Sequence, residues 1–123
     1  MRIVLVVVGG AIGALLRYAV EGWFAGRTGI SFPYGTLVVN VTGSFALGLL
    51  SVFTIERLLL SPEARLFVGV GLLGAYTTFS TWQYESWRLI ESGSWPLAVV
   101  NLGGSLVLGF AALVVGVLIG RAL

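Results

Sequence analysis

The chain has 123 residues, of which 58% are hydrophobic and only 10% are charged, with seven arginines, five glutamates and a net charge of +2. A soluble domain usually carries about 25% charged residues, so this composition predicts an integral membrane protein. Lysine, aspartate, histidine and cysteine are absent, which argues against an enzyme and excludes His- and Cys-based nucleophiles, zinc sites and a P-loop lysine. The scattered arginines form no stripe for nucleic acid.

The first half of the chain predicts two membrane spans. A transmembrane helix needs about 20 apolar residues, and residues 3–24 form such a stretch, interrupted only by Arg17 and Glu21. No cleavage signal follows it, so we interpret it as a span rather than a signal peptide. We predict a loop over residues 26–33 and a second, uncharged span over residues 35–55.

The second half predicts two further spans. The tripeptide Ser-Pro-Glu at 61–63 is typical of a helix start, with Ser as N-cap and Pro at the first helical position. We predict a third span over 66–84, a short polar loop over 85–91 and a fourth span over 97–119. The fold class is therefore an all-α, four-helix transmembrane protein. It has one domain, 1–123, and both termini lie on one side.

Small residues recur at helical spacing in these spans. Eighteen residues are glycine, about twice the usual share. Small residues four apart let helices approach closely in lipid, so we expect tight helix packing within a subunit or between subunits. The pairs are Gly9 and Gly13, Ser44 and Gly48, Ser105 and Gly109, and Gly116 and Gly120.

Glycines followed by hydroxyl residues occupy the middle of the third span. Threonine is a weak helix former, and Ser and Thr hydroxyls compete for backbone hydrogen bonds. The pattern is compatible with a broken helix and with an intact helix whose hydroxyls bond to their own turn. A break at membrane depth would offer carbonyls to a cation and N–H groups to an anion. The residues are Gly69, Gly71, Gly74, Thr77, Thr78, Ser80 and Thr81.

Polar side chains also form stripes on the second and fourth spans. Asn40 and Ser44 share one helical face, and Asn101 and Ser105 repeat that spacing. An unpaired amide in hydrocarbon is costly, so Asn40 either joins two helices or donates hydrogen bonds to a dehydrated anion. Polar stripes on three spans are what a narrow conduit needs.

Two aromatic residues and two charged residues have open interpretations. The edges of Phe79 and Trp82 carry positive potential that can contact an anion, or the rings serve only in packing. Arg17 either snorkels to the interface or lines a wet vestibule that attracts anions. Glu85 ends the third span, either at the interface or as the partner of an Arg.

The distribution of arginines sets only a weak orientation. Four lie on the side of the termini and two or three on the other, so the positive-inside rule barely selects one topology. The chain is therefore expected to insert both ways. The first group is Arg2, Arg57, Arg65 and Arg121; the second is Arg27 and Arg88, with Arg17 tending that way.

Three sequence runs resemble one family closely. They are residues 9–18 (GGAIGALLRY), residues 35–45 (GTLVVNVTGSF) and residues 74–82 (GAYTTFSTW) followed by Glu85. Together they are similar to the Fluc/CrcB fluoride channels over essentially the whole chain. The resemblance implies an antiparallel, dual-topology homodimer with two fluoride pores and a central structural sodium ion at the dimer interface.

The resemblance also implies residue roles. The backbone carbonyls of Gly74 and Thr77 would hold the sodium ion. Arg17 is assigned to a vestibule from its position in the first span, not from the resemblance. Two positions depart from the family, which usually has Phe where Trp82 stands and often Tyr where Asn101 stands. The predicted pore residues are Asn40, Ser44, Phe79, Thr81, Trp82 and Ser105, of which the resemblance implies Asn40, Phe79, Trp82 and Ser105.

The sequence thus predicts a passive fluoride channel that exports cytoplasmic fluoride across a prokaryotic inner membrane and gives fluoride resistance. Its partners would be fluoride, membrane lipid and a second copy of itself. The alternative is a small multidrug-type, proton-coupled transporter, for which Glu21 is the only candidate carboxylate in the first span. A subunit that only assembles would explain the glycines but not the hydroxyl run.

Overall fold

The computed structural model describes residues 1–123, and all of its regular elements are helical. Three stretches are π-helical, with wider turns than an α-helix, and each continues directly into or from an α-helix. The elements in chain order are α1 (Arg2–Thr28), α2 (Tyr34–Ser51), η1 (Val52–Glu56), α3 (Pro62–Ala64), η2 (Arg65–Leu73), α4 (Gly74–Tyr76), α5 (Ser80–Glu91), α6 (Trp95–Val99), η3 (Val100–Gly104) and α7 (Ser105–Ala122).

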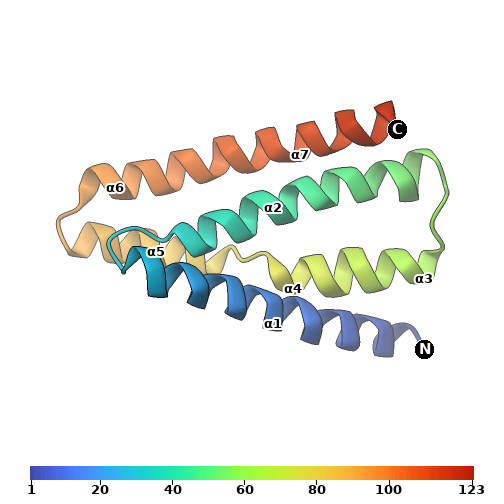
Figure 1. Ribbon diagram of the computed structural model, residues 1–123, viewed down its shortest axis with the longest axis horizontal. Helices are drawn as coiled ribbons and strands as arrows, with labels where there is room; N and C mark the ends of the chain where they lie inside the picture. The colour runs from blue at the N-terminus through green and yellow to red at the C-terminus, as the bar shows by residue number, and fades with distance from the viewer.

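The helices form four antiparallel passages along the bundle, and both termini lie at the same end (Figure 1). Helix α2 packs along α7, and α1 packs along η2 and α4. The path from α3 through α5 makes the third passage in two helical pieces (Figure 1). The predicted placement of both termini at one end is therefore confirmed.

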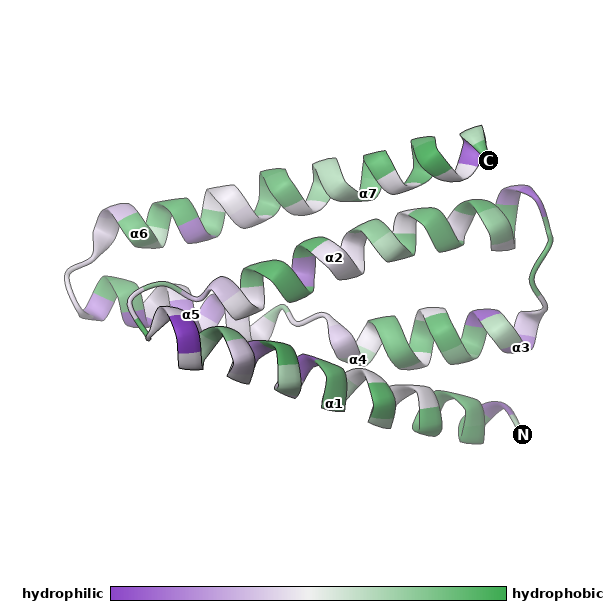
Figure 2. Ribbon diagram, viewed as in Figure 1, coloured by the Kyte–Doolittle hydropathy of each residue, from purple (hydrophilic) through white to green (hydrophobic).

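Three helices are long and apolar enough to cross a membrane: 2–28, 34–56 and 95–122. Hydrophobic residues dominate these helices, whereas α5 is mostly polar or neutral (Figure 2). The predicted third span, 66–84, is not one continuous helix, because α4 ends at Tyr76 and α5 begins at Ser80. The predicted polar loop over 85–91 is wrong, since α5 continues to Glu91.

The predicted tight packing of small residues is confirmed within the subunit. A methyl group added to Gly9 or Gly13 would collide with the η2 backbone at Phe67 or Leu72, and one added to Gly48 would collide with that of α7 at Leu113. Backbones this close exclude any side chain larger than hydrogen. The glycines therefore fix two close helix pairs, α1 with η2 and α2 with α7.

The end of the bundle that carries the termini is closed by local polar contacts. Ser61 caps α3 by accepting a hydrogen bond from the Ala64 N–H at 3.1 Å, as the sequence predicts. Glu56 forms an ion pair with Arg121, the shortest N–O distance being 2.6 Å. Arg57 donates to the Arg121 carbonyl at 2.9 Å. These contacts join the end of η1 to the C-terminus of α7.

Candidate functional site: an interrupted helix beside a groove

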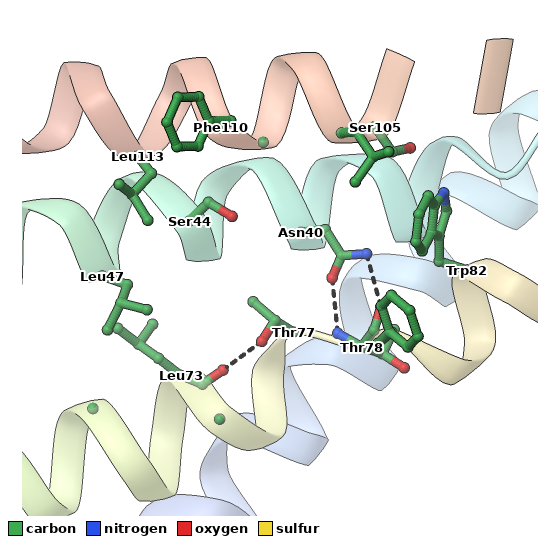
Figure 3. A pocket seen from close by; sticks show the side chains of 15 residues that line it. Asn40, Ser44, Leu47, Leu73, Thr77, Thr78, Trp82, Ser105, Phe110 and Leu113 are labelled. Carbon is green, nitrogen blue, oxygen red and sulfur yellow. Dashed lines mark hydrogen bonds between the residues drawn. The ribbon is translucent and has the colours of Figure 1, made fainter. Parts of the chain in front are cut away.

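The third passage is interrupted between α4 and α5. Thr77 has extended backbone angles, φ −79° and ψ 155°, so the helix cannot continue through it. Asn40, on α2, faces this interruption and pairs with Thr78 (Figure 3). Its Nδ2 donates to the Thr78 carbonyl and its Oδ1 accepts from the Thr78 N–H, both at 2.8 Å. The amide thus satisfies both backbone groups of a residue that lies outside a helix.

The interruption leaves the carbonyls of residues 74–77 without their helical donors, and those of Gly74 and Thr77 are two of them. In a continuous helix the Gly74 carbonyl would accept from the Thr78 N–H, but that group donates to Asn40. The Thr77 carbonyl would accept from the Thr81 N–H, but that group donates to Thr78 Oγ1 at 3.3 Å. These are the two carbonyls that the family resemblance implied as ligands for a sodium ion.

Arg17 lies against the same interruption from α1. Its Nε donates to the Ala75 carbonyl at 3.2 Å. In a continuous helix that carbonyl would accept from the Phe79 N–H. Neither alternative considered for Arg17 included this contact, in which the guanidinium caps the C-terminal end of α4. The residue does not line the groove described next.

A groove of about 450 Å³ runs beside the interruption, between α2, η2, α5 and α7 (Figure 3). It contains most of the predicted site residues, drawn from three segments that are distant in sequence. Thr81 is an exception, since it lies behind Thr78, whose Oγ1 donates to its hydroxyl at 3.1 Å. The predicted site residues in the lining are Asn40, Ser44, Gly74, Thr77, Phe79, Trp82 and Ser105.

The two aromatic residues of the groove differ in their surroundings. Their ring centroids are 5.3 Å apart with an interplanar angle of 60°. Phe79 is 69% exposed, so packing within the subunit does not explain its position. Trp82 is buried, and its indole Nε1 donates to the Asn101 carbonyl at 2.9 Å. The indole N–H is therefore committed to the protein, while the ring still borders the groove.

Asn101 does not extend the polar stripe that the fourth span predicts. The side chain is buried in the subunit and is absent from the groove lining. Its Oδ1 accepts from Ser105 Oγ at 3.4 Å, and its Nδ2 donates to Ser86 Oγ at 2.9 Å. Asn101 lies in η3, one turn before Ser105, and its amide is directed to Ser86 of α5 instead of the groove.

The groove also has an apolar wall that sequence reasoning missed. Leu113 follows Ser105 by eight residues, at helical spacing from a residue already predicted to line a pore. Extending the face of Ser105 and Gly109 by one more turn would have found Leu113. No comparable signal marks Leu47 and Leu73, which come from other segments. The groove-lining residues that the sequence analysis did not name are Leu47, Leu73, Leu106, Phe110 and Leu113.

Two carboxylates meet at the opposite end of the bundle from the termini. Thr36 Oγ1 donates to Glu85 Oε1 at 2.8 Å, and Glu21 packs against the adjacent Gly35. One oxygen of each carboxylate is buried without a hydrogen-bond partner. Both groups border a cleft of about 940 Å³ between α1, α5 and the chain between α1 and α2. The expectation of an Arg partner for Glu85 is wrong, because its hydrogen bond is to Thr36.

Comparison with known proteins adds an independent finding. The profile of the family described as "CrcB-like protein, Camphor Resistance (CrcB)" matches residues 4–117. A protein of Roseiflexus sp. named "Fluoride-specific ion channel FluC" is 49% identical over 123 residues, covering 100% of this chain and 99% of that protein. Proteins of the same name from Chloroflexus aurantiacus and Geobacter metallireducens are 45% and 41% identical. The alignments cover 98% and 100% of this chain, and 95% and 99% of those proteins.

Proposed function

The chain belongs to the CrcB-like family, and from this premise and the groove geometry we propose that it is a fluoride-selective, passive ion channel. The observation that carries the proposal is the position of Asn40 at the interrupted helix, inside a groove of amide, hydroxyl and aromatic groups. The groove contains no charged side chain. A fixed positive charge would retain a permeating anion, whereas neutral donors replace its hydration water and release it again.

The lining residues supply weak donors along the path of the ion. Asn40 has two amide hydrogens, and only one hydrogen bond is formed by its Nδ2, so the second can donate to an anion. The Ser44 and Ser105 hydroxyls border the same groove from α2 and α7. Phe79 presents a largely exposed ring, whose positive edge can contact an anion. Trp82 contributes its ring only.

The working unit is proposed to be an antiparallel homodimer that spans the membrane. Exposed aromatic and apolar side chains on the groove wall, Phe79, Leu106 and Phe110, support a second copy as the missing wall. Lipid would otherwise meet the polar lining of the groove, which is unfavourable. The weak orientation bias of the arginines supports insertion in both directions.

The interruption also fits a structural sodium ion. Hard cations prefer oxygen ligands, and the carbonyls of Gly74 and Thr77 have lost their helical donors. Both residues border the groove that a second copy would cover. When bound, sodium would supply positive charge that neutralises carbonyl oxygens at membrane depth. Two neighbouring carbonyls already have donors, since Asn40 donates to that of Thr78 and Arg17 to that of Ala75.

Export needs no energy source besides the membrane potential. Hydrogen fluoride is a weak acid that crosses membranes as a neutral molecule and dissociates in the less acidic cytoplasm. A potential that is negative inside drives the trapped anion out through a passive pore, with about 2.3 kcal/mol per elementary charge for 100 mV. The chain would therefore give fluoride resistance from the inner membrane of a prokaryotic cell.

The test is an efflux measurement in liposomes that contain the purified protein. We expect fluoride to leave far faster than chloride, with neither ATP nor a proton gradient. A multidrug-type transporter would instead export organic cations in exchange for protons and leave fluoride inside the liposomes. Equal fluoride and chloride rates would overturn the proposed selectivity, and no fluoride efflux would overturn the proposed function.

A further inference from the structure

A closed ring of hydrogen bonds lies directly behind the groove. Trp82 Nε1 donates to the Asn101 carbonyl at 2.9 Å, and Asn101 Nδ2 donates to Ser86 Oγ at 2.9 Å. Ser86 Oγ donates to the Trp82 carbonyl at 2.8 Å, which closes the ring. Ser86 and Asn101 are at most 2% exposed. The ring joins α5 to η3 with no polar atom left to water.

Asn101 also forms two hydrogen bonds with Ser105, the first residue of α7. The Ser105 N–H donates to the Asn101 carbonyl, and Ser105 Oγ donates to Asn101 Oδ1 at 3.4 Å. The Asn101 carbonyl thus accepts from two donors, one from its own helix and one from Trp82. A carbonyl oxygen has two lone pairs, so both are used.

The position of Asn101 relative to the groove separates its role from direct ion contact. Trp82 and Ser105 line the groove, whereas Asn101 and Ser86 do not. We propose that Asn101 is a positioning residue that determines selectivity by holding the Trp82 ring and the Ser105 hydroxyl in place. This inference rests on the proposed channel function, because Trp82 and Ser105 matter only if the groove conducts.

The physical basis is the fixed orientation of the Trp82 ring. Its N–H end is anchored on the Asn101 carbonyl, and the ring packs on Phe79 at 5.3 Å. A buried hydrogen bond removes rotational freedom from a side chain, because leaving its donor unpaired in the interior is costly. The Trp82 indole in turn limits where the exposed side chain of Phe79 can move. A pore that must exclude chloride needs walls that do not yield to a larger anion.

The experiment compares Asn101→Ala with wild type in two measurements. The first is the ratio of chloride to fluoride efflux from liposomes, which we expect to rise about tenfold, the effect of losing roughly one buried hydrogen bond. The second is fluorescence of Trp82 in a chain whose other tryptophans, Trp23, Trp87 and Trp95, are replaced by Phe. We expect a shifted emission and easier quenching by acrylamide in the Asn101→Ala chain.

Two further variants make the test specific. In a Trp82→Phe background, Asn101→Ala should change the efflux ratio less than it does in wild type, because the anchor on the ring is already absent. Thr54→Val is the control, since Thr54 is a buried hydroxyl whose hydrogen bonds stay within its own turn. It should alter neither the ratio nor the emission of Trp82.

The outcomes distinguish this inference from the proposed function. An unchanged efflux ratio in Asn101→Ala would overturn the positioning role, whether or not the emission shifts. A wild-type chain that passes no fluoride would overturn the channel itself, and with it this inference. If Asn101→Ala does not fold, Ser86→Ala opens the same ring from α5 and is expected to raise the ratio in the same direction; an unchanged ratio there would also overturn the inference.

Discussion

Asn40 and Thr78 exchange two hydrogen bonds of 2.8 Å beside the groove. The side-chain amide of Asn40 thus replaces the backbone groups with which the N–H and the carbonyl of Thr78 would pair in a continuous helix. This pairing unites the two interpretations of Asn40 that the sequence left open. The side chain joins two helices, and it also stands in the groove with one amide hydrogen not used by Thr78. Its structural role and its proposed donor role are consequences of the same position.

Substitution of Asn40 by Leu should therefore affect both conduction and stability. Leucine has no donor for the ion and leaves both Thr78 backbone groups unpaired, at a cost of about 1–3 kcal/mol for each buried group. We expect fluoride efflux to fall at least about tenfold and the unfolding temperature in detergent to drop. Thr54→Val, remote from the groove, should retain both properties. Wild-type efflux in a folded Asn40→Leu protein would assign Asn40 to structure alone.

Arg17 provides a second test, in which capping and charge attraction predict different results. The Nε–Ala75 hydrogen bond of 3.2 Å requires a guanidinium donor at a fixed position. Lysine keeps the charge but lacks the planar group. If Arg17 caps α4, Arg17→Lys and Arg17→Gln should both lower efflux, and added salt should change the ratio of mutant to wild-type rates little. If Arg17→Lys conducts like wild type and Arg17→Gln approaches it at high salt, long-range attraction is the role.

Much of the fold could be predicted from the sequence because lipid imposes simple rules. Uninterrupted apolar stretches predict the helices, and the observed helices 2–28, 34–56 and 95–122 contain the predicted spans 3–24, 35–55 and 97–119. The boundaries extend further because helices continue into the interface, where charged residues such as Arg27 and Glu56 are tolerated. The polar α5 was missed beyond residue 84, since hydropathy alone cannot tell an interfacial helix from a loop.

The site was only partly predictable, and the reason is that partners come from distant segments. The family motif placed Asn40, Phe79 and Ser105 in the groove, but no spacing in the chain indicates that Asn40 pairs with Thr78. The contact of Arg17 with the Ala75 carbonyl could not be predicted either, because it depends on the residue at which α4 ends. Asn101 was assigned to a pore stripe at a spacing of four from Ser105, but its amide donates to Ser86 of α5, a contact that no spacing in the chain indicates.

The packing glycines give a matched pair on one helix. Gly13 of α1 faces the η2 backbone, where an added methyl group would collide with Leu72, whereas Gly22 on the same helix has no atom near that position. Gly13→Ala should destabilise the protein by about 1–3 kcal/mol through overpacking. Gly22→Ala should be neutral or slightly stabilising, since alanine is the better helix former by about 1 kcal/mol. Thermal unfolding followed by size-exclusion chromatography measures both, and equal midpoints would contradict the close contact of α1 with η2.

Removal of sodium tests the role of the Gly74 and Thr77 carbonyls. A cation that binds only the folded dimer raises its stability in proportion to the logarithm of its concentration. We expect the unfolding temperature and the fluoride efflux to be higher in sodium than in N-methyl-D-glucamine. Potassium, a larger ion, should substitute poorly. If elemental analysis shows the protein to be free of sodium and it still conducts at the wild-type rate, sodium has no role in conduction.

The last prediction concerns the orientation of the two subunits. By their places in the helices, Arg2, Arg57, Arg65 and Arg121 belong to the side of the termini and Arg27 and Arg88 to the other side, with Arg17 inside α1. This excess of about two charges barely selects a topology. A two-fold axis in the membrane plane would place the groove of one copy against that of the other, and would bring both Thr77 carbonyls to one point.

Shifting the charge balance should therefore disturb function without touching the groove. Two lysines added after Leu123 should force one orientation, because positive residues close to a span are retained in the cytoplasm. Fluoride efflux should fall, and co-expression of a copy with two lysines placed beside Gly29 should restore it, since each chain then supplies the orientation that the other lacks. Adding two glutamines after Leu123 is the matched control and should leave efflux unchanged. Uniform insertion of the lysine-tagged chain, with wild-type efflux when expressed alone, would rule out the antiparallel dimer.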